Sequence, residues 1–164
     1  MSISTCVRSL FLAALLLIGG LASGRDAKAG EIAVQPHQVG GVDLALLEVK
    51  RTSGNTLTVK WEYRNKTKEK KQLTDQRTGW IDPYRLSVDM YLLDTKHHVK
   101  YTVAVDDTRH PIAGKHTGQN EYIFVGPKQT LATWAKFAAP PEDVEKVTVS
   151  IPGAPPFEDV PISK

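Results

Sequence analysis

Stretches in which apolar and polar residues alternate recur along this chain, and this alternation restricts it to β-structure. The clearest example is residues 56–64, whose apolar members are Leu57, Val59, Trp61 and Tyr63. Successive side chains of a strand point to opposite sides, so a period of two places these four on one face. We therefore predict a half-buried strand here, with Trp61 in the core.

The same alternation predicts six further strands, at about 42–50, 84–94, 99–105, 121–125, 130–137 and 146–151. Turn-forming residues separate them, such as the "RTSGN" segment that joins the first predicted strand to residues 56–64 in a hairpin. The apolar faces expected for two of them are formed by Leu86, Val88, Met90 and Leu92, and by Val99, Tyr101, Val103 and Val105.

The chain closes with the proline-rich segment "PGAPPFEDVPIS", residues 152–163. Proline cannot donate a hydrogen bond to a sheet, so this segment is expected at a sheet edge or outside the pairing. Phe157, Val160 and Ile162 can still pack sideways onto a core. We predict an extended cover strand rather than a disordered tail.

These elements define a fold class. About seven short strands, separated by turns at intervals of roughly ten residues and without a convincing amphipathic helix, indicate an all-β chain folded as an antiparallel β-sandwich. Residues 42–164 are expected to form this single domain, with residues 30–41 as an N-terminal linker.

Residues 1–29 have the layout of a secretory signal peptide. Arg8 precedes the apolar run "LFLAALLLIGGLA", which is too short to span a bilayer comfortably, and small residues follow. The triplet Ala27-Lys28-Ala29 predicts cleavage before Gly30, with Ala22-Ser23-Gly24 as an earlier alternative. An uncleaved anchor helix is the competing interpretation. The protein is expected to be exported, periplasmic or extracellular, with no transmembrane segment in the mature chain.

Cysteine and charge narrow the class further. The only cysteine, Cys6, lies within the leader, so the mature chain can form no disulfide. A lipoprotein would carry a cysteine just after the apolar run, where Arg25 stands, so no lipid anchor is expected. The chain has 21 basic and 18 acidic residues. The leader holds more basic than acidic residues, so the mature chain is nearly neutral. A nucleic-acid binder usually carries a marked basic excess, so no nucleic-acid partner is expected.

One local basic cluster, "RNKTKEKK", occupies residues 64–71. We interpret it as a solvated loop between strands, although such clusters sometimes contact acidic partners. Its tripeptide Asn65-Lys66-Thr67 matches the N-glycosylation pattern, but an asparagine at this place also suits a strand-ending turn.

Metal ligands would have to come from histidine and carboxylate side chains. His110 and His116 bracket a loop that follows Asp106 and Asp107, and these side chains could converge on an ion. No spacing matches a recognised zinc pattern, and exposed loop histidines are the simpler interpretation. We therefore expect no cofactor, with a metal site at these residues as the alternative.

The sequence carries no catalytic motif. It has no G-x-S-x-G elbow and no phosphate-binding glycine loop, and the mature chain has no thiol. Scattered serine, histidine and acidic residues carry no information about geometry. The protein is not expected to be an enzyme.

Trp80 lies in the turn-rich segment "RTGWIDPYR", close to Tyr84 and Arg85. A flat ring beside polar groups could stack on a sugar or anchor a partner protein, so Trp80, Tyr84 and Arg85 are the candidate binding residues. Alternatively, Trp80 plugs one end of the sandwich. Around Trp134 the alternation does not decide which face is buried.

Three segments carry a resemblance to known proteins. They are "LEVKRTSGNTLTVKWEYRN", "VGPKQTLATW" and "WAKFAAPPEDVEKVTVSIPGAPPFEDVPIS". The chain resembles, from about Val42 to Ser163, a family of bacterial exported immunoglobulin-like domains of unknown function, which occur alone or beside outer-membrane protein A-type peptidoglycan-binding modules. The resemblance implies an immunoglobulin-like sandwich in the cell envelope and supplies no catalytic residues.

Two functions are therefore considered. The first is a non-catalytic, secreted or periplasmic binding or accessory module of the bacterial cell envelope, whose partner is an envelope protein or glycan. It predicts an exposed aromatic surface around Trp80 and Tyr84. The second is a periplasmic carrier of a small ligand or metal, which requires His110 and His116 to lie together with Asp106 or Asp107.

Overall fold

The computed structural model describes residues 30–74, 82–117 and 121–164 of the 164-residue chain. Within these residues the regular structure is β-strand in antiparallel sheets, apart from a single-turn 3-10 helix, η1 (Asp82–Tyr84). The prediction of an all-β chain with antiparallel sheets is confirmed. The predicted leader, residues 1–29, and Trp80 lie outside the described residues.

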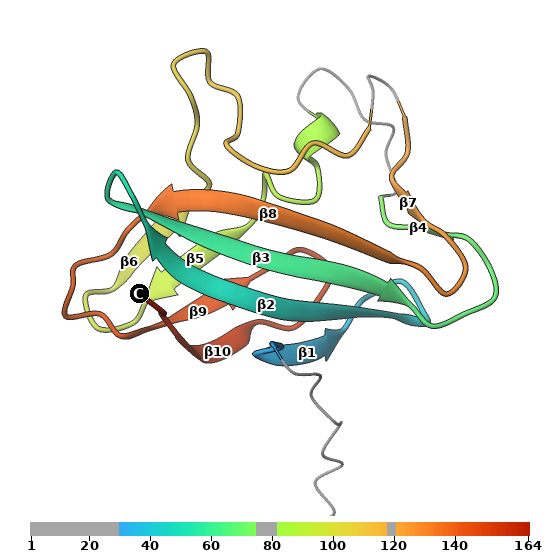
Figure 1. Cartoon of the computed structure of the whole chain (residues 1–164), viewed down its shortest axis with the longest axis horizontal. Coiled ribbons are helices and arrows are strands. Elements are labelled where there is room, and N and C mark those ends of the chain that lie inside the picture. Colours follow the sequence, from blue (N-terminus) through green and yellow to red (C-terminus); the bar gives the residue numbers. More distant parts are fainter. Residues whose placement is uncertain (1–29, 75–81, 118–120) are drawn as a thin grey trace, which may run out of the picture.

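The first sheet has four strands in the order β1-β2-β3-β8 (Figure 1). They are β1 (Ala33–Pro36), β2 (Val42–Thr52), β3 (Thr56–Asn65) and β8 (Thr130–Ala138). β2 and β3 form the predicted hairpin, in which Leu46 is opposite Trp61. β3 also pairs with β8, which places Phe137 opposite Leu57. The sheet therefore presents one continuous apolar face.

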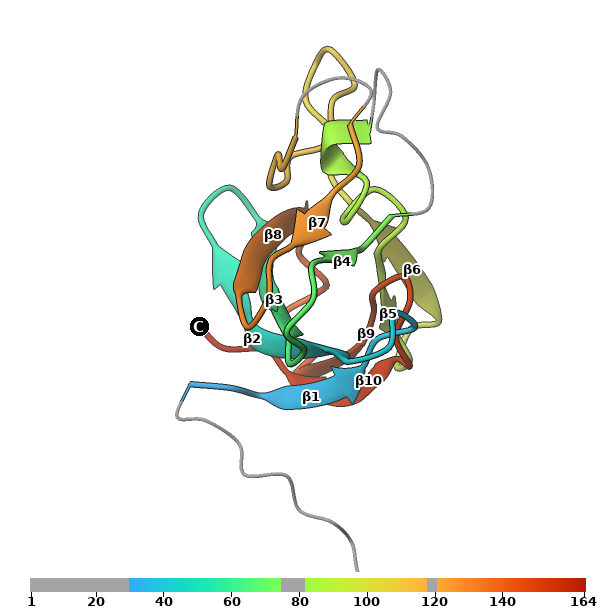
Figure 2. The same cartoon turned by 90° about the vertical axis from the view of Figure 1, so that its right-hand side faces the viewer.

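The second sheet has the order β10-β9-β5-β6, and it faces the first (Figure 2). Its strands are β10 (Phe157–Pro161), β9 (Lys146–Ser150), β5 (Tyr91–Asp94) and β6 (Val99–Thr102). A two-stranded ribbon of β4 (Lys71–Gln72) and β7 (Phe124–Val125) lies beside the end of β3. The ribbon and η1 both belong to connections between the main strands.

The core lies between the two four-stranded sheets. Trp61 is completely buried, as predicted, and so are residues of both sheets, including Leu57, Val59, Phe137, Leu92 and Val149. Fully burying one such side chain stabilises a fold by about 1.5–3 kcal/mol. Contact between these two apolar faces is therefore the main force that holds the sheets together.

The prediction of a strand over residues 84–94 is wrong over residues 84–90. There the chain forms η1 and a turn, because the amides of Ser87 and Val88 both donate to the Tyr84 carbonyl, at 2.8 and 3.0 Å. Ser87 is buried and Val88 only partly so, the reverse of the expected faces. Leu86 and Met90 are both buried, as four-residue spacing in a turn also allows.

The strand predicted at residues 99–105 is shorter in the structure. β6 ends at Thr102, Val99 and Val105 are 39% and 54% exposed, and Val103 is buried. β6 is an edge strand, and Val105 lies on a hairpin beyond it, bridged to Pro111. Side chains in these positions stay uncovered even where their alternation resembles that of a buried face.

The closing segment forms the extended edge strand that its sequence predicts. β10 pairs with β9 and contains Pro161, while Phe157 and Val160 are buried. Beyond β10 the chain reaches the first sheet, where the Ser163 amide donates to the Val49 carbonyl at 2.8 Å. The tail therefore ties the two sheets together.

Residues 30–41, expected as a linker, add β1 to the first sheet. β1 pairs with residues 43–46 of β2. It has four residues, which is too few for alternation to distinguish a strand from a loop. The sheet therefore begins before residue 42, the predicted start of the domain.

Candidate functional site

A polar pocket lies at the end of the sheets where β3 ends. Its walls come from the β1–β2 connection, the end of β3, the long β3–β5 connection and the β9–β10 connection. The cavity has a volume of about 100 Å³, which leaves room for a few waters or a small polar group. It is lined by His37, Gln38, Tyr63, Leu73, Thr74, Arg85, Leu86, Asp89 and Pro152.

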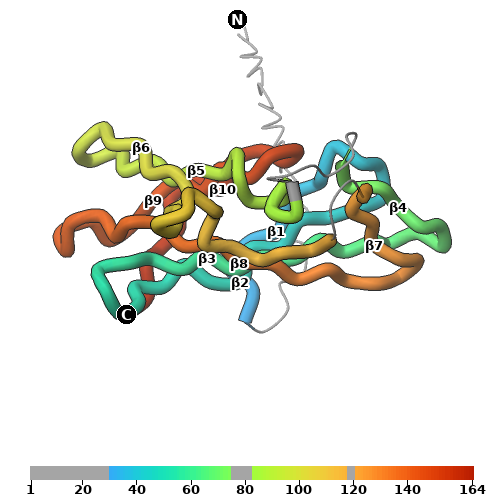
Figure 3. The backbone as a smooth tube through the Cα atoms, turned by 90° about the horizontal axis from the view of Figure 1, so that it is seen from above, coloured from blue at the N-terminus to red at the C-terminus, as the bar shows by residue number. Residues whose placement is uncertain are grey.

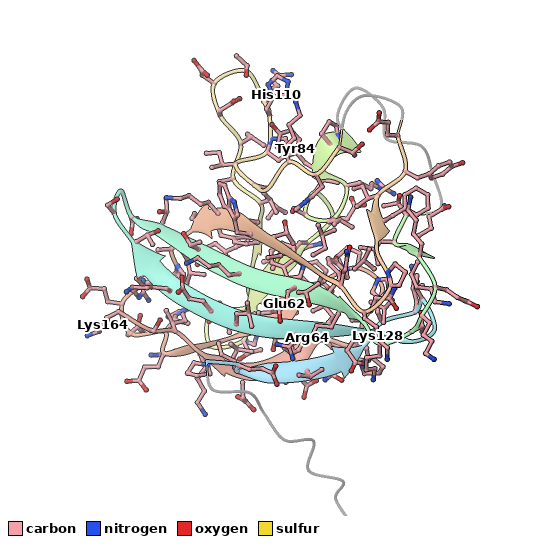
Figure 4. All side chains as sticks on the ribbon, turned by 45° about the vertical axis from the view of Figure 1, so that its right-hand side comes forward. Glu62, Arg64, Tyr84, His110, Lys128 and Lys164 are labelled. Atoms are coloured by element: carbon pink, nitrogen blue, oxygen red, sulfur yellow. The ribbon has the colours of Figure 1, made fainter. Side chains whose placement is uncertain are left out.

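The structure places one of the three predicted binding residues in this pocket. Arg85 follows η1 and lines the cavity, with its Nη1 3.1 Å from the Asp89 carboxylate. Tyr84 lies next to it in η1, partly buried against the core (Figure 4). Trp80 is outside the described residues. Both members of the Arg85–Asp89 pair are partly exposed, so their attraction is weak and a ligand can compete for it.

His37 is a buried wall of the pocket. Its Nδ1 accepts the Val39 amide at 3.2 Å, and its ring packs edge-on against Tyr63 with centroids 5.3 Å apart. Gly153 passes so close that a side chain there would collide with the imidazole. Burial lowers the pKa of His37 and outweighs a hydrogen bond to the Pro152 backbone that raises it. The ring is therefore mainly neutral at neutral pH.

Neutral polar residues line the same cavity as the charged Arg85. Tyr63 is buried, and burial raises its pKa to about 12, so the phenol stays protonated. Thr74 also lines the cavity, and its hydroxyl accepts the Ile123 amide at 3.3 Å. A cavity that combines a guanidinium with neutral polar residues suits a small polar or negatively charged group of a ligand.

The sequence carries little signal for most of this pocket. His37, Tyr63, Thr74 and Pro152 lie far apart in the chain and meet only through the fold. Alternation correctly predicts Tyr63 as a core residue, but it says nothing of a cavity at the end of the strand. Only Arg85 is marked in advance, as a charged residue in a turn-rich segment.

The structure does not bring the four candidate metal ligands together. His110 lies on a projecting hairpin (Figure 4), with its Nδ1 3.9 Å from the Asp106 carboxylate, and Asp107 is exposed. His116 instead shares a 2.6 Å hydrogen bond with the Thr133 hydroxyl. Among the residues that the structure describes, no group of three or more histidine, cysteine or acidic side chains is placed to hold a metal ion.

Another histidine lies in the β5–β6 turn. His97 Nδ1 is 2.8 Å from the buried Asp94 carboxylate, and its Nε2 is 3.4 Å from Asp143. Asp94 also accepts the amides of Lys96 and His97. Desolvation raises the pKa of Asp94, but these hydrogen bonds outweigh it, so the pKa lies below its usual value. The contacts fix the turn, and both ring nitrogens of His97 face carboxylates rather than a nucleophile.

Asn65 has a structural role rather than that of a glycan acceptor. It is 3% exposed, and its Nδ2 donates to the carbonyls of Glu69, Val125 and Gly126 at 2.6, 3.3 and 2.9 Å. Its Oδ1 accepts the amide and the hydroxyl of Thr67, at 2.9 and 2.8 Å. A sugar on Nδ2 would break these bonds. Of the two sequence interpretations, the strand-ending turn is correct.

The structure also decides which face of β8 is buried. Ala135 and Phe137 are completely buried, whereas Trp134 is 38% exposed. Trp134 is opposite Lys60 in register, on the outer face of the first sheet. It does not line the pocket around Arg85.

Comparison with known proteins leaves the fold and the pocket as the basis for a function. No family model, curated protein or solved structure matches this chain. In the described part of the chain, no helix has the length and apolar character that crossing a bilayer requires.

Proposed function

We propose that this protein is an exported, non-catalytic binding module of the bacterial cell envelope, built on an immunoglobulin-like β-sandwich. Its partner is an envelope protein or glycan that places a small polar or negatively charged group beside Arg85. The observation that carries the proposal is the convergence of three connections and the end of β3 on one polar pocket.

The strand order supports the immunoglobulin-like part of the proposal. If β1 and the β4–β7 ribbon are set aside, seven strands remain, with the orders first-second-fifth and seventh-sixth-third-fourth in the two sheets. An immunoglobulin constant domain has strands A, B, E and D in one sheet and C, F and G in the other. The order here differs only in the sheet to which the fourth strand belongs.

The position of the pocket supports binding. In immunoglobulin variable domains, the loops after strands B and F lie at one end and take part in recognition. The corresponding connections here are β3–β5, which supplies Thr74 and Arg85, and β9–β10, which supplies Pro152. Loops on a rigid scaffold are frequent binding sites, so the position of these connections favours recognition of a ligand.

The chemistry of the pocket favours binding over catalysis. His37 is held through Nδ1 by the Val39 amide and by a hydrogen bond to the Pro152 backbone. Tyr63 has a pKa of about 12, so its phenolate is unavailable as a base at neutral pH. These groups can orient a polar ligand but do not form an activated nucleophile.

The sequence of residues 1–29 supports export, because it has the charged, apolar and small-residue regions of a signal peptide. Among the described residues, the first backbone hydrogen bond of the first sheet runs from the Ile32 amide to the Leu46 carbonyl, at 2.8 Å, so it lies after a cleavage site before Gly30. The cell-envelope assignment itself rests on the family resemblance of residues 42–163.

A crosslinking experiment tests the proposal. The mature chain, residues 30–164, is used to capture components from crosslinked envelope extracts, alongside the double variant Tyr84→Ala, Arg85→Gln. We expect a specific protein or glycan that the wild type recovers and the variant loses. Arg109→Gln removes the same charge from an exposed loop and should keep the partner. Recovery of the same component by all three proteins, or of nothing specific by any, would count against the proposal.

A further inference from the structure

The β4–β7 ribbon and the chain on either side of it carry exposed lysines and aromatic rings. The residues are Lys66, Lys68, Lys70, Tyr122, Phe124 and Lys128, and we call them the basic-aromatic surface. Figure 4 shows Lys128 at the end of β3, apart from Tyr84 and His110. The surface is therefore distinct from the pocket around Arg85, which none of these six residues lines.

Three of these lysines carry unbalanced charge. Within the described residues, no carboxylate forms an ion pair with Lys68, Lys70 or Lys128. The neighbouring acids Asp43 and Glu69 are each paired with other lysines, and the Glu121 carboxylate accepts the Thr117 hydroxyl. An anionic partner could approach these three amines without first displacing an acidic side chain.

Two exposed aromatic rings lie beside one of these amines, that of Lys70. Phe124 and Tyr122 are 38% and 36% exposed, and they pack edge to face with centroids 6.2 Å apart. The Lys70 ammonium lies 4.0 Å from the centre of the Phe124 ring. This contact covers one ring face, which disfavours stacking of a base or sugar there. The ring edge can still enter a lipid headgroup layer while the ammonium meets a phosphate.

The ribbon is held in place by buried hydrogen bonds. β4 and β7 pair through Lys71 with Val125 and Gln72 with Phe124. Asn65 donates to the carbonyls of Glu69 and Gly126, on the two chain segments of the ribbon. The ribbon thus holds Lys70 and Phe124 in place close to the end of β3, and Lys128 is tied to the β3–β4 connection, because its amine and amide donate to the Lys66 and Thr67 carbonyls at 2.6 and 3.0 Å.

From these observations we infer that the basic-aromatic surface binds the surface of an anionic phospholipid bilayer. The inference rests on the export part of the proposed function, which brings the mature protein to a membrane, and not on the pocket. One lysine near an anionic membrane strengthens binding by about 1 kcal/mol, or about fivefold, so three contribute about a hundredfold. The interaction is weak and depends on salt.

Vesicle sedimentation tests this inference. The mature chain is mixed with vesicles of phosphatidylcholine, and with vesicles of equal parts of phosphatidylcholine and phosphatidylglycerol. We expect binding to the second kind only, and its loss at about 1 M salt, where the Debye length falls to about 3 Å. The triple variant Lys68→Gln, Lys70→Gln, Lys128→Gln should bind about a hundredfold more weakly. Phe124→Ala should bind about fivefold more weakly and keep the salt dependence.

Matched controls separate this surface from general charge and from the pocket. The variant Lys50→Gln, Lys115→Gln, Lys146→Gln loses three exposed lysines elsewhere and should bind like the wild type. Arg85→Gln should also bind vesicles normally, so a failed pocket and a failed membrane surface give different results. Thermal unfolding of each variant shows whether it is folded.

Three outcomes would overturn the inference. The first is equal binding to both kinds of vesicle, and the second is unchanged binding by the variant that lacks Lys68, Lys70 and Lys128. The third is retention on an immobilised sulfated polysaccharide without binding to vesicles, because the surface would then recognise a soluble polyanion.

Discussion

Asn65 and Asp94 both fix the turn that follows a strand, but they do so at opposite ends of the molecule and with different chemistry. Figure 3 shows the β4–β7 ribbon at one end and the β5–β6 turn at the other. Asn65 is neutral, and its amide bonds carbonyls of the ribbon. Asp94 is a carboxylate that accepts two backbone amides and bonds His97. Both are almost completely buried, at 3% and 1% exposure.

The hydrogen bonds of Asn65 involve no group that titrates, whereas those of Asp94 depend on an ionised carboxylate. Asn65 lies beside the proposed binding surfaces, and its hydrogen bonds hold the ribbon over the pH range in which carboxylates titrate. Asp94 holds the β5–β6 turn at the other end of the molecule, and its hydrogen bonds should weaken in acid.

The largest effect is expected for Asn65→Asp. The variant replaces a donor amide with a carboxylate that faces the carbonyls of Glu69 and Gly126. Unsatisfied buried groups of this kind cost about 1–3 kcal/mol each, and more when charged, so the free energy of unfolding should fall by about 3 kcal/mol or more at pH 7. Urea unfolding measures it. Thr67→Val removes a hydroxyl that bonds Asn65 Oδ1 and the exposed backbone of Glu69 but leaves the Nδ2 bonds, so it should cost less. Similar losses in both variants would show that the Nδ2 bonds are not the main support of the ribbon.

Asp94→Asn should have a smaller effect that depends on pH. The variant keeps an acceptor for the turn amides but loses the charged oxygen that bonds His97, so about 1–2 kcal/mol of unfolding free energy should be lost at pH 7. The folded pKa of Asp94 lies below the ordinary 3.8, so its stabilisation is complete above that value and is lost as the pH falls through the folded pKa. Urea unfolding in steps of pH should show the two proteins converging in acid. If the difference in unfolding free energy between the two proteins stayed constant with pH, the charge of Asp94 would not be what stabilises the turn.

Acid should affect the pocket end first, through His37. The folded pKa of His37 is lowered below 6.5 by burial, so the unfolded chain binds more protons between those two values. The free energy of unfolding should therefore fall as the pH drops below 6.5, by at most about 1.4 kcal/mol per pH unit for this group. Burial lowers the pKa of His116 too, which adds a slope of the same sign.

The measurement is urea unfolding between neutral pH and the range where aspartate titrates. His37→Asn should flatten the slope. An unchanged slope in His37→Asn would mean that His37 is not the group that titrates there.

The two ends also differ in how well the sequence predicts them. Alternation over residues 56–64 correctly places Trp61 in the core, because β3 pairs along its length on both sides and has one buried face. At residues 84–90 the same alternation is wrong, since Leu86 and Met90 are buried in a turn whose hydrogen bonds the pattern does not encode. Alternation of apolar and polar residues is therefore a reliable predictor of buried faces where a strand pairs over a long stretch with its neighbours.

The pocket shows the same limit. Arg85 was identifiable because a charged residue in a turn-rich segment is a binding candidate, but His37 and Pro152 reach the pocket through connections that are distant in sequence. Asn65 is the intermediate case, because the Asn-X-Thr pattern allows both a glycan and a turn. Only the carbonyls around Nδ2, supplied by the ribbon, decide between them.

The smallest effect is expected for Lys96→Gln. The Lys96 amine is 2.5 Å from the Asp143 carboxylate, but both side chains are more than half exposed, at 55% and 52%, so solvent screens their attraction. The urea midpoint should not change measurably at moderate salt, while the Lys96 backbone amide still bonds Asp94. If this variant instead loses as much stability as Asp94→Asn, the stabilisation of this turn comes from the surface pair of Lys96 with Asp143 rather than from Asp94. The comparison of buried Asn65 with buried Asp94 would then fail, because the charge that stabilises the turn would be the exposed one of Asp143.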